Sequence, residues 1–503
     1  MAAKEISLKL LIHKERNQIL YAESGNDFVD VLFSFLTMPI GTVIRLAGKQ
    51  SKIGCMSSLY ASVEDLDVQY LQTESCKNML LHPKSASEEH CKKLRVNIDD
   101  TEPTNYYLCN SGYPLRSNFK HSISVYLSSK QCRCGGRVNW KMPKDKSKQG
   151  AGPAGDMKDG VFVKGISRYM ITDDLQISPI CMGTTLELLK RLGITDATVL
   201  EEKNVNLGSE EVLHLLKHSL LSKTPLTDVF LPLQHTIDGV VLDLKVMTLD
   251  SKDMAQSHTE KESCSNSKNI SVRLFMSKSR NKVLCAQVGK EFPDTLFSFL
   301  AFPLGFIVKC LGRCTNMGCL DNLYESVEQL GDKDYIKSEE HKALLVDPKL
   351  VPYFGSTNQL IQIKELLPPQ LTIFNCYYCL TNETCITDGE LGKCCHGYEK
   401  IQLELINPKF CDVVTELGGV FMAGQAAFMV TDELLVKPLS SISCLSLLNQ
   451  FNLPLSDLEE RFVSMGEEEA LSLLKACFIS KTVLSDVFLK RPKQLGRRSS
   501  LYS

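Results

Sequence analysis

Cysteine and histidine side chains gather in the second half of the chain at spacings that suit a metal ion. The set falls within 21 residues and consists of Cys376, Cys379, Cys385, Cys394, Cys395 and His396. Thiolate and imidazole groups are the ligands that tetrahedral zinc prefers. We therefore predict a zinc-ribbon-like hairpin with the ligands Cys379, Cys385, Cys394 and His396, and with Cys376 and Cys395 as alternates. Four protein ligands leave no open coordination position, so such a metal would be structural and would stabilise a loop-rich segment.

The alternative interpretation of this set is a group of ordinary buried or surface thiols. A zinc ribbon usually shows two C-x-x-C pairs, and the spacing here departs from that pattern. Because no export signal is evident, we expect most of the 20 cysteines to be reduced.

The first half of the chain contains a smaller version of the cysteine set. Residues 132–135 (CRCG) align with residues 394–397 (CCHG), which places Cys134 opposite His396. Cys109 then corresponds to Cys379, while the position of Cys385 is taken by a leucine. With the three ligands Cys109, Cys132 and Cys134, the first half is predicted to hold a weaker zinc site.

The two halves of the chain resemble each other throughout. Residues 6–66 and 270–330 align without a gap and are identical at 27 of 61 positions. The shared motifs include LFSFL-x-x-P-x-G, G-C-x-x-x-L-Y, and SKT-x-L-x-DVFL near the end of each half. We interpret the chain as a tandem duplication, since solenoid repeats are far shorter than this period.

The duplication predicts the domain organisation. Copy A is expected at 1–249, a polar linker at 250–269, copy B at 270–489 and a basic tail at 490–503. A segment rich in lysine, glycine and proline, at 141–159, has no counterpart in copy B and is expected to be disordered.

Hydrophobic periodicity predicts an α+β fold with small antiparallel sheets. Each copy is expected to contain a cysteine-bearing hairpin insert. The strands and helices expected from the pattern are a hairpin at 7–12 and 19–22, helices at 26–36, after Gly41 and at 59–66, a strand and tight turn at 169–175 and 428–434, and helices at 184–192, 210–221 and 467–479.

Other candidate metal or catalytic residues lose support when the two copies are compared. His214 and His218 have the i, i+4 spacing of a helical metal pair, but a serine and an alanine replace them in copy B. Cys55 and Cys319 match, yet both copies share no histidine to activate them, so we predict packed thiols.

Two polar motifs shared by the copies are predicted to be structural. The Thr-Asp pairs at 172–173 and 431–432 are expected to cap backbone N–H groups in turns. Lys223 is expected to complement a helix C-terminus, and Thr224 to cap the helix that follows.

Composition argues against several classes of function. The net charge of −2 provides no general basic field for nucleic acid. No signal peptide is recognisable, and no run of about 18 apolar residues indicates a membrane span. We therefore expect a protein of the cytoplasm, with the nucleus as the alternative.

The motif set LFSFL-x-x-P-x-G, G-C-x-x-x-L-Y, TD-[DE]-L and SKT-x-L-x-DVFL resembles that of a plant protein family, domain of unknown function 674. The resemblance covers nearly the whole chain and both copies. It implies a plant origin and the two-copy layout, and it implies no particular activity.

The leading functional hypothesis is a non-enzymatic binding or scaffold protein with an unidentified protein partner and zinc as a structural metal. An enzyme would be expected to keep a convergent set of polar groups. Two alternatives stay open: a small-molecule-binding enzyme with a site between the halves, and a zinc-ribbon nucleic-acid binder that uses the lysines of 141–148 and the basic tail.

Overall fold

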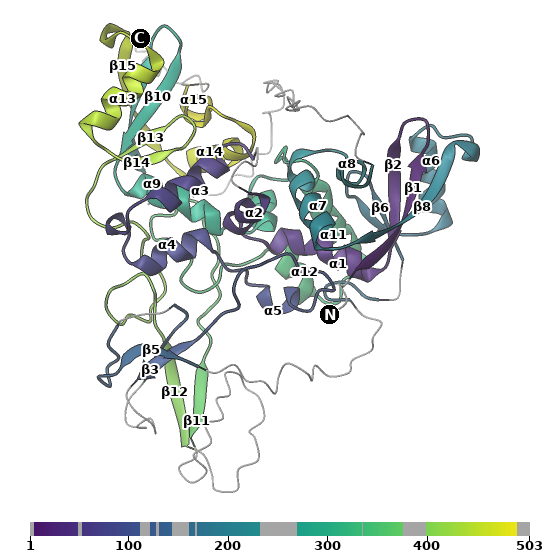
Figure 1. Ribbon diagram of the computed structural model, residues 1–503, viewed down its shortest axis with the longest axis horizontal. Helices are drawn as coiled ribbons and strands as arrows, with labels where there is room; N and C mark the ends of the chain where they lie inside the picture. Colours follow the sequence, from purple (N-terminus) through teal and green to yellow (C-terminus); the bar gives the residue numbers. More distant parts are fainter. Residues whose placement is uncertain are drawn as a thin grey trace, which may run out of the picture.

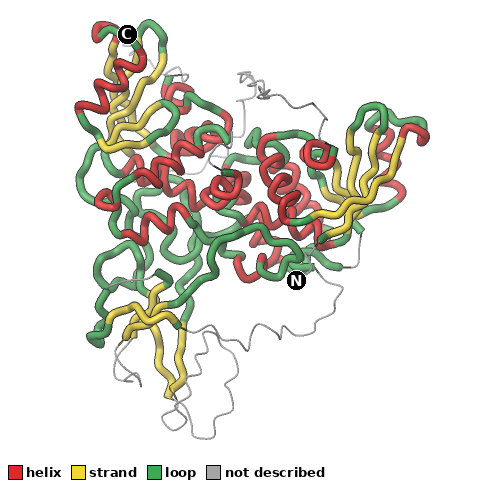
Figure 2. Tube along the Cα trace, in the orientation of Figure 1, coloured by secondary structure: helices red, strands yellow, loops and turns green. Residues whose placement is uncertain are grey.

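The computed structural model describes residues 5–48, 53–110, 121–126, 130–142, 160–165, 168–231, 269–333, 335–375 and 399–489. Within these ranges, helices occupy the centre of the molecule and strands form three small sheets at its corners (Figures 1 and 2). The predicted α+β class is confirmed. The second-half cysteine set lies outside the described residues, as do residues 143–159 of the insertion predicted at 141–159. Lys141 ends a strand, so the expected disorder does not begin at that residue.

The first sheet contains only strands from the first half of the chain, in the order β7-β6-β2-β1-β8. Their bounds are β1 Ile6–His13, β2 Gln18–Ser24, β6 Tyr169–Thr172, β7 Ile177–Pro179 and β8 Leu200–Leu207. All of its pairings are antiparallel. The predicted hairpin at 7–22 is confirmed, and Asn17 adopts a left-handed conformation at its tip (φ 46°).

The second sheet has the same strand order in the second half, β14-β13-β10-β9-β15. Its strands are β9 Ile270–Ser277, β10 Lys282–Val288, β13 Phe428–Thr431, β14 Val436–Pro438 and β15 Leu458–Met465. Asn281 has φ 45°, like Asn17 in the first sheet. The register of both hairpins skips one residue at equivalent leucines, Leu20 and Leu284, so the two sheets share a β-bulge.

The third sheet combines strands from both halves in the order β11-β12-β4-β3-β5. Its strands are β3 Tyr107–Asn110, β4 His121–Ser124, β5 Arg137–Lys141, β11 Leu371–Asn375 and β12 Glu399–Leu405. Strand β4 pairs with β12 in parallel, whereas the other pairings of this sheet are antiparallel, so it is mostly antiparallel, as expected. The pairing of β4 with β12 joins the first half of the chain to the second.

The helices of the first half are mostly short. They are α1 Asn26–Ser34, η1 Phe35–Thr37, α2 Ile40–Ala47, α3 Met56–Asp65, η2 Val68–Tyr70, α4 Glu74–Leu81, α5 Glu88–Cys91, α6 Met182–Arg191, η4 Ala197–Val199, α7 Ser209–Leu221 and α8 Pro225–Phe230. Those of the second half are α9 Glu291–Ser298, η5 Phe299–Ala301, α10 Leu304–Cys310, α11 Leu320–Asp332, α12 Glu339–Val346, α13 Ser441–Phe451, η6 Leu455–Asp457, α14 Glu467–Ile479 and α15 Val483–Phe488.

Two helices lie against the sheet of the opposite half. The side chain of Ser62 on α3 accepts the N–H of Val436 on β14 at 2.9 Å. Ser326 on α11 accepts the N–H of Ile177 on β7 at 2.8 Å. Both strands are edge strands. Each half therefore supplies a side-chain acceptor to a backbone N–H group on an open sheet edge of the other half.

One hydrophobic core runs through the centre and includes residues of both halves. The LFSFL segments supply much of it, since Leu32, Phe33, Leu296 and Phe297 are fully buried. None of the helices in the described ranges is long and apolar enough to span a lipid bilayer.

Candidate metal centre

The centre lies where β3, β4 and β5 meet in the third sheet. A tight turn follows Cys132, whose N–H donates to Gly136 O at 2.7 Å, while Gly135 N–H donates back to Cys132 O at 2.8 Å. Gly135 has φ 91°, a conformation that side chains other than glycine rarely adopt. The turn brings Cys132 and Cys134 to the same side of the sheet end, next to β3 and β4.

Four potential metal ligands converge at this point. They are Cys109 on β3, His121 on β4, and Cys132 and Cys134 in the turn, and their ligand atoms all lie within 4.8 Å of one another. Cys109 Sγ lies 3.1 Å from His121 Nδ1 and 3.6 Å from Cys134 Sγ.

These distances suit a tetrahedral ion better than a disulfide. A zinc–sulfur bond of about 2.3 Å places neighbouring thiolates about 3.8 Å apart in a tetrahedron, whereas a disulfide needs about 2.05 Å. Cys109, His121 and Cys132 are buried and Cys134 is half-buried, so the cluster is closed to bulk water on most sides.

The surroundings of Cys132 favour its thiolate form. A hydrogen bond from the Cys109 thiol, together with the backbone N–H groups of Cys134 and Ser122, holds the pKa of Cys132 well below its usual range. The Ser122 N–H lies 3.3 Å from Cys132 Sγ. The pKa of Cys109 is raised, because it donates its proton to Cys132 and is also buried. A cation that replaced this shared proton would satisfy all three sulfurs.

The structure brings together the three first-half residues identified from the sequence, Cys109, Cys132 and Cys134. It adds a fourth, His121, which the sequence comparison missed because the second half offers no histidine to align with it. The available signal was that His121 is the only histidine between Cys109 and Cys132. The second-half set, Cys376 to His396, lies outside the described residues.

Comparison with known families gives one result. A family model described as a protein of unknown function (DUF674) matches residues 2–468. The chain belongs to the DUF674 family. The family resemblance seen in the motifs is thereby confirmed. No curated protein and no solved structure matches the chain.

The matching cysteines of this DUF674 chain are packed thiols, as predicted. Cys55 and Cys319 precede α3 and α11, and both are buried. The Cys55 thiol donates to Ser480 O at 3.0 Å and the Cys319 thiol to Ser222 O at 3.1 Å. Burial raises the pKa of each to about 12. They therefore lack the low pKa of a cysteine nucleophile.

The shared Thr-Asp motifs cap short helices, which confirms the turn prediction. Asp173 accepts the N–H and hydroxyl of Thr227 on α8 at 2.9 and 2.7 Å. Asp432 accepts the equivalent groups of Ser485 on α15, both at 2.8 Å. The prediction that Thr224 itself caps α8 is wrong for the side chain, which makes no cap hydrogen bond, because Asp173 supplies the acceptor.

The lysine that follows α7 contacts the other half of the chain. Lys223 was expected to complement the C-terminus of its own helix, but its Nζ donates to Gly318 O at 2.9 Å. The ammonium group therefore lies in the contact between the halves.

The first helix of each half carries an aspartate at an equivalent position. Its carboxylate accepts hydrogen bonds from a loop that comes later in the same half. Asp30 accepts the N–H groups of Phe162 at 2.8 Å and Val163 at 3.1 Å. Asp294 accepts those of Phe421 at 2.7 Å and Met422 at 3.0 Å. Both carboxylates are buried and have raised pKa values because of desolvation, to about 6 for Asp30. They organise the fold by accepting these loop N–H groups.

The histidine pair on α7 is a surface feature, as predicted. His214 is exposed, and His218 lies 3.5 Å from Asp228 with 42% of its side chain exposed.

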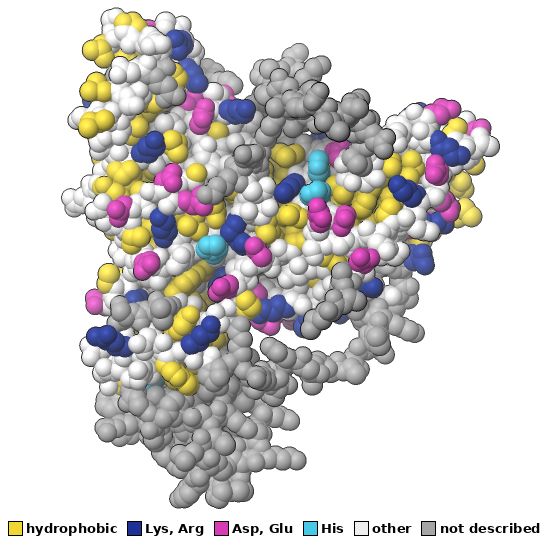
Figure 3. Space-filling view, viewed as in Figure 1, with side chains coloured by type: hydrophobic (Ala, Val, Ile, Leu, Met, Phe, Trp, Pro, Cys, Tyr) yellow, Lys and Arg dark blue, Asp and Glu magenta, His cyan; other side chains and the backbone are white. Residues whose placement is uncertain are grey.

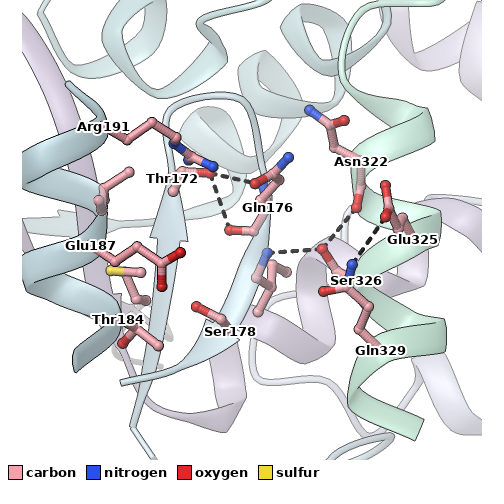
Figure 4. A pocket seen from close by; sticks show the side chains of 13 residues that line it. Thr172, Gln176, Ser178, Thr184, Glu187, Arg191, Asn322, Glu325, Ser326 and Gln329 are labelled. Atoms are coloured by element: carbon pink, nitrogen blue, oxygen red, sulfur yellow. Dashed lines mark hydrogen bonds between the residues drawn. The ribbon is translucent and has the colours of Figure 1, made fainter. Parts of the chain in front are cut away.

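A hollow of about 260 Å³ lies between the first sheet, α6 and α11 (Figure 4). Its lining side chains come from both halves and include Thr172, Ser178, Glu187, Arg191 and Glu325. It contains no histidine, cysteine or lysine, and none of the shared polar groups Arg16, Asp30, Lys223 and Asp228. The hollow therefore does not bring these shared polar groups together.

Proposed function

We propose that this DUF674 protein is a non-enzymatic binding or scaffold protein in which a structural zinc ion fixes the sheet shared by both halves. The observation that supports the proposal is the convergence of Cys109, His121, Cys132 and Cys134 at the end of that sheet. Three sulfurs and one imidazole nitrogen form a soft ligand set that suits zinc.

A structural role follows from the number of ligands. Four protein ligands fill the tetrahedral shell of zinc, so no position is left for a reacting water. Strands β3, β4 and β5 are only four or five residues long, and the energy of metal binding would stabilise them.

The polar residues shared by the two halves support a role without catalysis, because they form hydrogen bonds to the backbone. Among the described residues, Asp30, Asp173 and their counterparts accept backbone N–H groups, and Cys55 and Cys319 donate to carbonyls. Residues used in this way maintain a fold, whereas an active site directs such groups toward a substrate.

We further propose that residues 1–249 and 270–489 are duplicated copies of one module. The equal strand order of the first two sheets supports this proposal. A protein partner and a place in the cytoplasm or nucleus complete the proposed function.

The test is the zinc content of the full chain, purified from zinc-supplemented cells without chelator. We expect at least one zinc per chain, and the loss of one equivalent in His121→Ala and in Cys134→Ser. The matched control is Cys314→Ser, which removes an exposed thiol distant from the cluster in sequence and should leave the zinc content unchanged. Any further equivalent would be assigned to the second-half set with Cys394→Ser. A wild-type chain without zinc, or variants that keep the full content, would refute the metal centre.

A further inference from the structure

The segment that holds the metal ligands differs in charge from the rest of the chain. From residue 103 to 143 the sequence contains six lysines and arginines and no aspartate or glutamate, whereas the whole chain has a net charge of −2. The same segment contains the only tryptophan, Trp140, on β5. Charge and aromatic surface therefore coincide at the metal centre.

A β-bulge in β5 places an arginine and the tryptophan on one face of the sheet. Arg137 pairs with Asn110 and Trp140 with Leu108, while Asn139 is skipped by the register. Leu108 and Asn110 are two residues apart on β3, so their side chains share a face. Their partners share it too, although residues three apart on a regular strand would face opposite ways.

Two more cations lie at the sheet edge that β5 forms. Arg133 lies between the ligands Cys132 and Cys134 in the turn, and both it and Lys141 are exposed. Lys141 follows Trp140 at the end of β5 and pairs with Tyr107, so it lies on the other face of this edge strand. Within the described ranges, none of Arg133, Arg137 and Lys141 forms an ion pair, and β5 is the edge strand of its sheet. Figure 3 shows dark-blue side chains beside hydrophobic ones over this part of the molecule, at the lower left.

The indole ring is partly open to solvent. Trp140 is 36% exposed, in contrast with its strand neighbour Val138, which is fully buried. A half-exposed aromatic ring near guanidinium and ammonium groups that form no ion pair within the described residues is the combination with which proteins hold single-stranded nucleic acids: bases stack on the ring and phosphates contact the cations.

We propose that this surface, formed by Arg133, Arg137, Trp140 and Lys141, binds single-stranded nucleic acid. A base stacks on Trp140, and the flanking phosphates pair with the three cations. The inference rests on the proposed function in one respect: the metal fixes the turn that carries Arg133. Single strands are favoured over a duplex because a strand edge with one ring offers a stacking position and no element to enter a groove.

The experiment uses the full chain and a labelled oligothymidylate of 12 nucleotides. Fluorescence anisotropy reports total binding, and the intrinsic emission of the single tryptophan reports contact at Trp140 itself. We expect the emission to be quenched with the same midpoint as the anisotropy rise. The slope of log K against log salt should be about −2 for three phosphate contacts.

Four variants separate this surface from the rest of the chain. Trp140→Ala should weaken binding roughly tenfold or more. Arg137→Ala and Lys141→Ala should each weaken it and reduce the salt slope by about 0.7. Lys203→Ala, which removes an exposed cation from β8 in the first sheet, should change neither.

The outcomes distinguish this inference from the metal proposal. Anisotropy without tryptophan quenching, unchanged binding by Trp140→Ala, or preference for duplex DNA or phosphatidylserine vesicles would each overturn the nucleic-acid surface. Zinc content, measured on every variant, should stay unchanged. Binding with quenching in a zinc-free chain would uphold the surface and refute the metal proposal, and a zinc-loaded chain that fails to bind would do the reverse.

Discussion

Pro39 and Pro303, which occupy equivalent positions in the two halves, face each other across an antiparallel bridge. Two hydrogen bonds of 3.0 Å flank them, from Ile40 N–H to Phe302 O and from Leu304 N–H to Met38 O. Their backbone angles agree within a few degrees (φ −65°, ψ 146° and φ −68°, ψ 145°). The two halves also exchange helices: α3 of the first half contacts β14 of the second, and α11 of the second half contacts β7 of the first.

Two glycines are expected to be essential for this exchange. Gly54 and Gly318 have φ of 47° and 50°, and an added Cβ would lie 2.1 Å from Cys477 O and 2.3 Å from Ser219 O, respectively. Gly318→Ala should therefore lower the free energy of unfolding by about 2–5 kcal/mol, measured by urea denaturation. Gly25→Ala is the control, because an added Cβ there meets nothing within 4 Å and should cost less than about 1 kcal/mol. Equal effects of the two substitutions would contradict the argument.

Metal removal should loosen a strand that contributes no ligand. Strand β12 pairs with β4, which carries His121, and Ile406 N–H donates to Ile123 O at 2.9 Å. Chelation of zinc should speed amide hydrogen exchange in residues 403–406 at least tenfold, because local opening becomes easier. Peptides from β9, in the second sheet, provide the internal control. Unchanged exchange in β12 would mean that the metal does not stabilise the joint between the halves.

Thiol reactivity should divide the cysteines by environment. With pKa values of about 12, Cys55 and Cys319 are each ionised to the thiolate in only about one molecule in 10⁴ at pH 8. Cys181 is exposed, and hydrogen bonds with Thr184 lower its pKa. Mass spectrometry after brief iodoacetamide treatment should find Cys181 modified before Cys55 and Cys319, which should react only after denaturation. Early labelling of Cys55 would show that its contact with Ser480 opens readily.

Acidification should weaken the contact between α5 and α12. The rings of His90 and His341 meet edge to face with centroids 5.4 Å apart, and burial lowers both pKa values. Lys93 and Lys337 lower the pKa of each histidine further, whereas Glu89 raises that of His90 and Glu340 that of His341.

The direction in which folding stability changes with pH follows from proton uptake by the two histidines. Because the folded-state pKa values lie below the unfolded value of about 6.5, the unfolded chain binds protons first, so this stabilisation is present above about pH 6.5 and is lost below it. The fall in Tm from pH 7 to 5.5 should be larger in wild type than in the double variant His90→Gln/His341→Gln. Equal falls would exclude these histidines as the cause.

The local elements with strong periodicity were predictable from the sequence. The hairpins at the start of each half and the helices α7 and α14 have apolar residues at strand or helix spacing, and they form where expected. Strands β8 and β15 were missed, because seven of the eight residues of β8 are at least partly exposed and show no apolar alternation. They become strands because β1 and β9 supply a full-length edge for pairing.

The candidate site was predictable only in part. Cys132 and Cys134 are close in sequence, whereas His121 joins them through the pairing of β3 with β4, which spacing alone does not reveal. The helix expected at 26–36 is divided into α1 and the 3₁₀ turn η1, which ends at Thr37. The position of His121 was missed because tertiary pairing, and not local propensity, decides which side chains meet.

The exchange of α3 and α11 has a consequence for biosynthesis. While the ribosome has translated only the first half, Ile177 lacks its acceptor, since Ser326 has not yet been made. The nascent first sheet therefore keeps an open edge during this interval, and contacts so distant in sequence form slowly. A ribosome that stalls before residue 326 would therefore release a product with an open sheet edge, which is prone to edge-to-edge association.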